Sequence, residues 1–193
     1  EDILKMAGVG EDFVETQSVV KSTRIRLPWL FASCLGGVLA SFVISSFEGG
    51  LKHFILLAPF IPVITGMGGN VGAQSSTIVV RGLATGRLDV RDFWSVVMKQ
   101  LAVGVLLGLI YGAFLGGVAR VRFHQDIIPW VLSTTVGLSV FCSMSLAALM
   151  GSFVPMVFRK INIDPAVASG PFISTTIDVI GIFIYLSIAT ILL

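Results

Sequence analysis

Five apolar runs, each of about 20 residues or more, divide this chain, and each is long enough to cross the roughly 30 Å hydrocarbon core of a bilayer as a helix. Of the 193 residues, 55% are hydrophobic and only 12% are charged, and the mean hydropathy is +0.95. A soluble domain of this length cannot bury so much apolar surface and still present a charged exterior. The sequence therefore predicts an all-α integral membrane protein with five transmembrane helices.

Short polar connections separate the predicted spans, which are Pro28–Phe47, about His53–Val80, about Trp94–Val118, Pro129–Phe158 and about Pro165–Leu193. The domain boundary is expected after residue 27, between a juxtamembrane segment (1–27) and a five-span domain (28–193). The chain begins with Glu1, and no signal peptide is visible before the first apolar run. We therefore expect a longer protein with a further N-terminal part.

The basic residues that flank the spans predict the orientation of the chain in the membrane, because Lys and Arg collect on the cytoplasmic side. One side receives Lys21, Arg24, Arg26, Arg81, Arg87, Arg91, Lys99, Arg159 and Lys160. The other side receives only Lys52, Arg120 and Arg122. We expect a cytoplasmic N-terminus and an external C-terminus. The net charge of +2 does not indicate nucleic acid as a partner, because the positive charges lie at the span ends.

Small residues recur every fourth position in two of the spans. The third span carries Gly104, Gly108, Gly112 and Gly116, and the first carries Ser33, Gly37, Ser41 and Ser45. Such ridges let helix backbones approach closely. We interpret both as packing surfaces, used within one protomer or across a dimer.

The second span is predicted to contain a broken helix. Pro59 and Pro62 remove backbone donors, and the four glycines between Gly66 and Gly72 weaken the helix further. Irregular backbone is tolerated at membrane depth only where it is buried in protein or lines a watery cavity. The carbonyl groups freed there are expected to act as oxygen ligands, and the alternative is a kinked helix whose glycines serve close packing.

Asp178 is the only charged residue between Pro165 and the end of the chain at Leu193. A carboxylate near the centre of a membrane helix costs about 2.5–3.5 kcal/mol to insert. It must therefore face protein, water or a cation, and such a group is typical of an ion, substrate or proton site. The alternative is a structural aspartate that hydroxyl groups on a neighbouring helix satisfy.

The polar groups predicted inside the membrane all offer oxygen. They are Asn70, Gln74, Thr175, Thr176 and Asp178. Oxygen ligands favour Mg²⁺, Ca²⁺ or Mn²⁺ over Zn²⁺ or Cu⁺. His53 and His124 lie near the opposite, external ends of spans, while Cys34 and Cys142 lie inside spans and are interpreted as packing residues. A soft-metal site is therefore not indicated.

Two long motifs identify a family. The region from Pro62 to Gly86 contains GGNVGAQSST at residues 68–77 and VRGLATG at 80–86, and the region 164–181 reads DPAVASGPFISTTIDVIG. Both resemble the MgtE family of magnesium transporters, and the resemblance covers the five-span domain nearly end to end. It implies a homodimer of five-helix protomers in the plasma membrane, with an ion pore along the dimer axis.

The resemblance also implies roles for individual residues. Asp178 matches the family's pore aspartate, which holds a hydrated Mg²⁺ near mid-membrane, and Asp164 matches an aspartate that binds regulatory Mg²⁺ near the cytoplasmic pore mouth. Gly69 and Asn70 match the segment that flanks the pore, and Thr175 joins the predicted oxygen ligands. Relatives usually carry a cytoplasmic acidic domain and a CBS pair, and residues 1–12 resemble the helix that links that pair to the membrane.

Two copies of Asp178 facing each other across a dimer axis predict a preference for divalent ions. Two adjacent carboxylates stay ionised together only when a cation lies between them, and a divalent ion neutralises the pair. This argument does not separate Mg²⁺ from Mn²⁺ or Ca²⁺. Before the first span, Glu11, Asp12 and Glu15 either help to bind Mg²⁺ at the cytoplasmic mouth or form a solvated helix face.

Three functions follow from these observations. The first is channel-like conduction of Mg²⁺, and the second is an ion- or proton-coupled carrier that uses Asp178 as a relay. The third, a membrane enzyme or a scaffold, is disfavoured because no nucleophile–base pair or metal triad stands out.

Overall fold

The computed structural model describes residues 18–49, 54–124, 129–168 and 170–193, and most of these residues are helical with no strand among them. The helical elements are α3 (Val19–Glu48), α4 (Phe54–Leu57), η1 (Ala58–Phe60), α5 (Ile61–Ala84), η2 (Val90–Asp92), α6 (Phe93–Arg122), α7 (Pro129–Lys160), α8 (Pro165–Ala168) and α9 (Pro171–Leu192). Five helical stretches are long and apolar enough to cross a membrane. The predicted all-α fold with five spans is confirmed.

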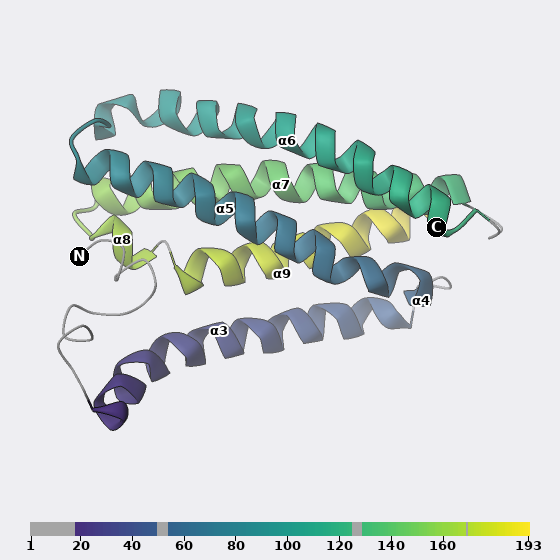
Figure 1. The fold of residues 1–193 in the computed structure, drawn as a ribbon, viewed down its shortest axis with the longest axis horizontal. Coiled ribbons are helices and arrows are strands. Elements are labelled where there is room, and N and C mark those ends of the chain that lie inside the picture. The colour runs from purple at the N-terminus through teal and green to yellow at the C-terminus, as the bar shows by residue number, and fades with distance from the viewer. Residues whose placement is uncertain (1–17, 50–53, 125–128, 169) are drawn as a thin grey trace.

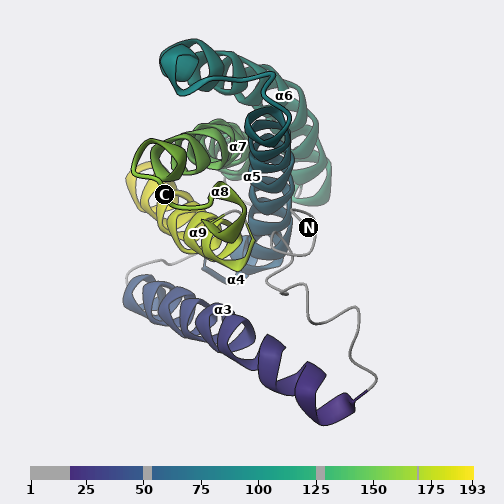
Figure 2. The ribbon, with the colours of Figure 1, turned by 90° about the vertical axis from the view of Figure 1, so that its left-hand side faces the viewer.

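Helix α7 forms the centre of the bundle and contacts α5, α6 and α9 (Figure 1). Its buried side chains recur at helical spacing, as the series Leu132, Val136, Val140 and Met144 shows. Helix α3 packs along α9 at the edge of the bundle, and the view along the bundle shows it set apart from α6 and α7 (Figure 2). The elements α3 and α6 therefore lie on opposite sides of the molecule.

The basic segments gather at one end of the bundle, where α3 begins, α5 ends and α8 lies (Figure 1). Arg81 lies in the last turn of α5, Arg91 in η2, and Arg159 and Lys160 in the last turn of α7. The opposite end carries Arg120 and Arg122 in the last turn of α6. The assignment of the first end to the cytoplasm stays a prediction.

The glycine ridge of α6 packs directly against α7, as predicted. A Cβ atom added to Gly108 would lie 2.9 Å from the carbonyl oxygen of Phe141, and one added to Gly112 would lie 2.6 Å from that of Gly137. The hydroxyl of Ser133 donates a 2.6 Å hydrogen bond to the carbonyl oxygen of Gly116, which ties the two helices together. These distances leave no room for a side chain, so backbone meets backbone along this contact.

The small residues of α3 pack in a different register from the predicted one. Gly36 and Ala40 are buried against α9, whereas Gly37 and Ser41 are exposed. A Cβ atom on Gly36 would meet the side chain of Thr175, while one on Gly37 would meet nothing within 4 Å. Within the protomer, the predicted ridge therefore does not form the helix contact.

The prediction of a helix break at Gly66–Gly72 is wrong, because α5 runs without interruption from Ile61 to Ala84. Close packing compensates for the low helix propensity of these glycines: a Cβ on Gly68 would lie 2.7 Å from Ser143 Oγ, and one on Gly72 would meet Ile177. Since the backbone is helical there, its carbonyl groups are not freed as ligands.

The irregular backbone lies earlier, at Pro59, where η1 interrupts the helix. The backbone N–H of Ile61 donates to the carbonyl of Ala58, three residues back, so Leu57 does not receive its usual helical partner. The hydroxyl of Tyr185 on α9 donates a 2.8 Å hydrogen bond to the Leu57 carbonyl instead. One carbonyl of this span is thus freed, but it lies before the predicted stretch, and a buried tyrosine satisfies it.

The fifth span also begins later than predicted. Residues Pro165–Ala168 form the separate short helix α8, and the long helix α9 begins only at Pro171. Gly170 has φ −86° and ψ −117°, outside the helical region, because a residue that precedes proline is sterically pushed away from it. Asp164 therefore immediately precedes the short helix α8, whereas Asp178 lies on the long helix α9.

Candidate functional site

Asp178 lies in the third turn of α9 and is half-buried against α5. A Cβ atom added to Gly69 would lie 3.8 Å from Asp178 Oδ1, so the carboxylate faces bare backbone at this point of α5. The absence of a side chain at Gly69 leaves room beside the carboxylate. Two of the predicted site residues are therefore neighbours in space although 109 positions separate them in the sequence.

A cavity of about 420 Å³ opens in front of this carboxylate, between α3, α5 and α9. Its walls combine small or apolar residues with five that carry side-chain oxygen: Ser33, Thr65, Ser174, Thr175 and Asp178. Among the described residues that line it none is basic, and the Asp178 carboxylate is the one charged group of that set. The cavity therefore attracts cations.

The hydroxyl groups of the cavity are oriented to accept hydrogen bonds. Ser33 donates its proton to the carbonyl of Trp29 at 3.2 Å, and Thr65 donates to the carbonyl of Ile61 at 3.0 Å. A hydroxyl has one proton and two lone pairs, so these groups keep lone pairs for water or a cation once the proton is used. The site thus offers one carboxylate surrounded by oxygen acceptors.

The described residues contain no group of three His, Cys, Asp or Glu side chains that could hold a metal ion directly. A single carboxylate with hydroxyl neighbours cannot replace the whole hydration shell of a small divalent cation. Mg²⁺ usually keeps several of its waters and binds through one or two carboxylates. The geometry therefore suits a hydrated ion better than a fully dehydrated one.

The other predicted site residues lie outside this cavity. Asn70 is exposed on α5 and shares an outer face with Gln74, four residues on, as predicted. The structure brings Asp178, Thr175 and Gly69 together and leaves Asn70 beside them on the protomer surface.

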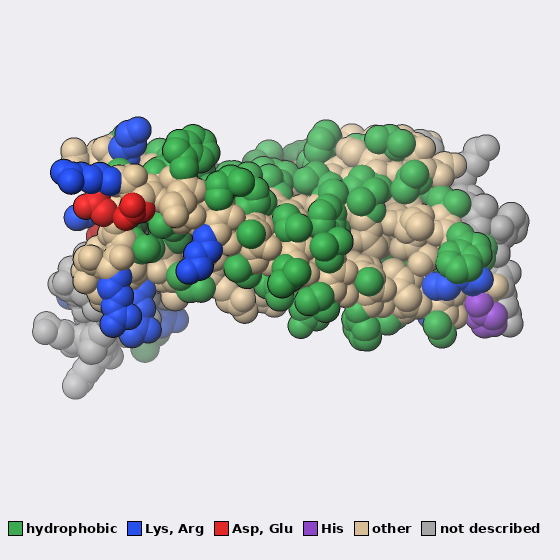
Figure 3. Space-filling model, turned by 90° about the horizontal axis from the view of Figure 1, so that it is seen from above, with side chains coloured by type: hydrophobic (Ala, Val, Ile, Leu, Met, Phe, Trp, Pro, Cys, Tyr) green, Lys and Arg blue, Asp and Glu red, His purple; other side chains and the backbone are tan. Residues whose placement is uncertain are grey.

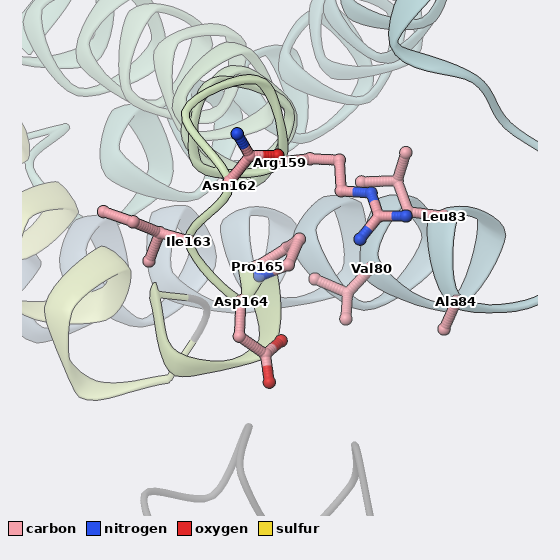
Figure 4. A pocket seen from close by; sticks show the side chains of 8 residues that line it. All are labelled: Val80, Leu83, Ala84, Arg159, Asn162, Ile163, Asp164 and Pro165. Atoms are coloured by element: carbon pink, nitrogen blue, oxygen red, sulfur yellow. The ribbon is translucent and has the colours of Figure 1, made fainter.

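Asp164 lies in a second cavity of about 520 Å³ at the end of the bundle where α5 and α7 finish. Its Oδ1 accepts a 3.0 Å hydrogen bond from the backbone N–H of Ala166, which caps the start of α8. Figure 4 shows Arg159 reaching across the cavity toward Leu83, while the Asp164 carboxylate points in another direction. Glu11, Asp12 and Glu15, predicted as partners of Asp164, lie outside the described residues.

Sequence reasoning missed the contribution of α3 to the Asp178 cavity. Ser33, Gly36 and Gly37 line it, and Gly36 approaches Thr175 so closely that a side chain there would collide with it. The signal was present as adjacent glycines at 36 and 37, but the spacing rule selected Gly37 and assigned the stripe to packing.

A bundle of membrane-crossing length with a lone carboxylate in an inner cavity defines a polytopic α-helical membrane protein with a cation-attracting interior. The sequence profile of the MgtE family, described as a divalent cation transporter, matches residues 61–188. The chain belongs to this family. The predicted family resemblance is confirmed, and because the family is described by transport, it also supports the prediction that the chain is not an enzyme.

Three relatives carry the name magnesium transporter MgtE. The protein from Thermus thermophilus is 37% identical over 195 residues, which cover 100% of this chain and 42% of the relative. The protein from Bacillus subtilis is 31% identical and that from Enterococcus faecalis 34%, each over 98% of this chain and 41% of the relative. The chain thus spans about two fifths of the length of these relatives.

Proposed function

We propose that this chain is the membrane domain of a Mg²⁺ transport protein and that Asp178 holds a hydrated Mg²⁺ during passage. The observation that carries the proposal is the Asp178 carboxylate in its 420 Å³ cavity, with hydroxyl acceptors around it and no basic side chain among the described residues of the lining. The names of the MgtE relatives support Mg²⁺ as the transported ion. Thr175, one turn before Asp178, lines this cavity, and the open backbone at Gly69 lies beside the carboxylate, so the ion's water shell has room at both places.

The exposed polar face of α5 supports a homodimer. Asn70 and Gln74 lie on the surface of a helix long enough to span a membrane, where lipid offers amide groups no partners. A second copy packed against this face gives them partners and places two Asp178 carboxylates near one axis. A divalent cation between them neutralises both charges, which favours Mg²⁺, and also Mn²⁺ or Ca²⁺, over monovalent ions.

Channel-like conduction is the mechanism we propose, because the electrical gradient alone drives a divalent cation inward. At a potential of 100 mV a doubly charged ion gains about 4.6 kcal/mol, so no coupling ion is required. The alternative is a carrier in which Asp178 exchanges a proton. In either case we place the chain in the plasma membrane, with Arg81 and Arg159 on the cytoplasmic side and the C-terminus outside.

Asp164 is proposed as a regulatory Mg²⁺ ligand near the cytoplasmic mouth. Its cavity opens at the end of the bundle that carries most basic residues, and its carboxylate is exposed. Relatives more than twice as long as this chain leave room for a cytoplasmic part that supplies further ligands. Glu11, Asp12 and Glu15 remain candidates for that role.

Mg²⁺ flux into proteoliposomes tests the role of Asp178. We expect Asp178→Asn to lower the flux at least about tenfold, which requires a change of only about 1.4 kcal/mol in the barrier. Asp92→Asn is the matched control, because Asp92 is exposed at the start of α6 and its side chain makes no capping hydrogen bond. Equal flux in both variants would remove Asp178 from the pathway.

Mg²⁺ flux into the same vesicles under different imposed gradients distinguishes a channel from a carrier. A potassium diffusion potential set with valinomycin should drive Mg²⁺ entry without any proton gradient. Flux that appears only with an imposed proton or sodium gradient would favour the carrier.

Disulfide formation in membranes tests the dimer. In a Cys34→Ser, Cys142→Ser background, Asn70→Cys should give a covalent dimer, whereas Leu106→Cys on the exposed face of α6 should not. A monomer in both cases would exclude the facing-carboxylate arrangement.

A further inference from the structure

A long apolar groove runs between α6 and α7, on the side of the bundle away from α3. It has a volume of about 930 Å³, and the small residues of α6 and α7 form its floor. Gly112 and Gly116 lie along this floor, and Leu138 and Phe141 form part of its wall. At one end the groove finishes at Arg120 and Trp130.

A second apolar groove of about 680 Å³ runs along α6 itself, beside the first. The two grooves share Ala113 and Gly117, which form a low ridge between them. Phe114 and Val118 line the second groove, which finishes at Arg122. The surface therefore carries two apolar grooves that small residues separate. Each groove ends at an arginine in the last turn of α6.

The guanidinium of Arg120 is placed to receive an anion. Its Cζ atom lies 4.4 Å from the centre of the Trp130 ring, so the ring covers one face of the planar group. Its Nε atom is buried and has no hydrogen-bond partner among the residues that the structure describes. A guanidinium donates in its own plane, and an aromatic ring on its face leaves the two terminal amino groups of Arg120 available as donors.

Basic side chains gather at this end of the bundle beside a histidine, and apolar side chains cover much of the surface from there toward the middle of the molecule (Figure 3). The Cζ atom of Arg122 lies 5.6 Å from the ring centre of Phe123, again an aromatic neighbour. Trp130 is 68% exposed at the same level, which is the position that tryptophan favours at a membrane–water interface.

We propose that the two grooves bind one diacyl phospholipid, with its phosphate on Arg120 and its two acyl chains on either side of the Ala113–Gly117 ridge. Arginine binds phosphate oxygens through paired, charge-assisted hydrogen bonds. Two narrow grooves separated by a ridge fit two thin hydrocarbon chains. A partner helix about 10 Å wide would have to lie across the ridge and would fill neither groove.

The headgroup is expected to carry a net negative charge. Arg120 and Arg122 both lie at the groove ends, and basic groups at a bilayer surface favour anionic lipids. Arg120 contributes more than Arg122, because it is half-buried and held against the Trp130 ring at the end of the larger groove, whereas Arg122 is exposed. Phosphatidylglycerol is therefore expected to bind more tightly than phosphatidylcholine.

Native mass spectrometry of the detergent-purified chain, titrated with each of these two lipids, tests the charge requirement. We expect Arg120→Gln to weaken phosphatidylglycerol binding about tenfold, the effect of losing one charge-assisted contact, and Arg122→Gln to weaken it less. Arg87→Gln is the matched control, because it removes the same charge from the exposed loop before the other end of α6. Equal losses in Arg120→Gln and Arg87→Gln would show a nonspecific charge effect and overturn the proposal.

The ridge provides a second test that does not depend on charge. A Cβ atom added to Gly117 meets nothing within 4 Å, so Gly117→Ala and Gly117→Leu should both fold and keep the thermal stability of the parent chain. We expect phosphatidylglycerol binding to fall with the size of the side chain, and a single-chain lysophospholipid to bind more weakly than the diacyl lipid in the parent. Unchanged lipid binding in Gly117→Leu, or a disulfide-linked dimer through Gly117→Cys in the cysteine-free background, would show that lipid does not occupy these grooves.

Discussion

The contact between α6 and α7 and the contact between α5 and α9 both use glycine, and they produce opposite results. Along α6, Gly108 and Gly112 face backbone atoms of α7 at distances that exclude any side chain. Along α5, a Cβ on Gly66 would meet nothing within 4 Å, and one on Gly69 would meet only the Asp178 carboxylate. Glycine brings the two backbones together in the first contact. In the second, Gly68 and Gly72 also pack closely, but Gly69 leaves space beside the carboxylate.

The difference lies in what stands opposite each glycine. The residues of α7 that face α6 include Gly137, so two bare backbones meet without a gap. The residue of α9 that faces Gly69 is Asp178, whose charge is satisfied only with water or a cation beside it. The α6–α7 contact is therefore structural, and the α5–α9 contact keeps room for a ligand beside Asp178. Substitutions should separate stability from transport in these two places.

The largest effect is expected where glycine meets backbone. A Cβ on Gly112 would lie 2.6 Å from the carbonyl oxygen of Gly137, and neither backbone can move away easily. Gly112→Ala should lower the free energy of unfolding by about 1–3 kcal/mol, and Gly112→Leu should abolish folding. The midpoint of thermal unfolding in detergent measures this, with Gly117→Ala on the same helix as a control that should change little. Equal stability of both alanine variants would show that α6 and α7 can move apart at this contact without loss of stability.

Substitution of Gly69 should impair transport with little loss of stability. The 3.8 Å distance to Asp178 Oδ1 is an ordinary contact, so Gly69→Ala fits, but a larger side chain occupies the space in front of the carboxylate. We expect Gly69→Leu to lower Mg²⁺ flux about tenfold, equivalent to roughly 1.4 kcal/mol in the barrier. Flux in proteoliposomes and thermal unfolding should be measured on the same preparation. If Gly69→Leu lowers stability as much as Gly112→Ala, the space beside Asp178 is as tightly packed as the α6–α7 contact.

The sequence predicted the spans well because each one is long, apolar and bounded by charge. It also predicted the Gly104–Gly116 ridge, since a strict spacing of four places residues on one helix face whatever the neighbouring helix. The choice of Asp178 as a site residue needed only the cost of a charge in lipid. These conclusions depend on properties of one segment at a time.

The errors concern what neighbouring segments supply. The Gly66–Gly72 stretch is helical because Ser143 and Ile177 from two other helices fill the space beside Gly68 and Gly72. The role of α3 in the Asp178 cavity depends on which of two adjacent glycines faces α9, and spacing alone does not decide that. Helix propensity and periodicity contain no information on either point, so the structure was required.

A smaller effect is expected at the α3 wall of the cavity, together with a rescue that identifies its cause. Gly36→Ala places a methyl group against Thr175 Cγ2, the end of a side chain that can rotate, so the loss should be about 1 kcal/mol. Thr175→Ser removes that methyl group and keeps the hydroxyl. The double variant should therefore unfold close to the parent temperature. Additive losses in the double variant would show that the two residues do not interact.

The smallest effect is expected at the hydrogen bond that fastens α9 to the irregular turn before α5. Tyr185 is fully buried and donates to the Leu57 carbonyl at 2.8 Å, so Tyr185→Phe leaves that carbonyl without its partner while the ring stays in place. Such bonds in membrane proteins contribute about 0.6 kcal/mol on average, and up to about 1.7. We expect a loss in this range, with Mg²⁺ flux retained, because neither residue lines the Asp178 cavity. A strong fall in flux at unchanged stability would show instead that the turn at Pro59 sets the shape of the Asp178 cavity. Transport would then depend on packing outside the α5–α9 contact as well.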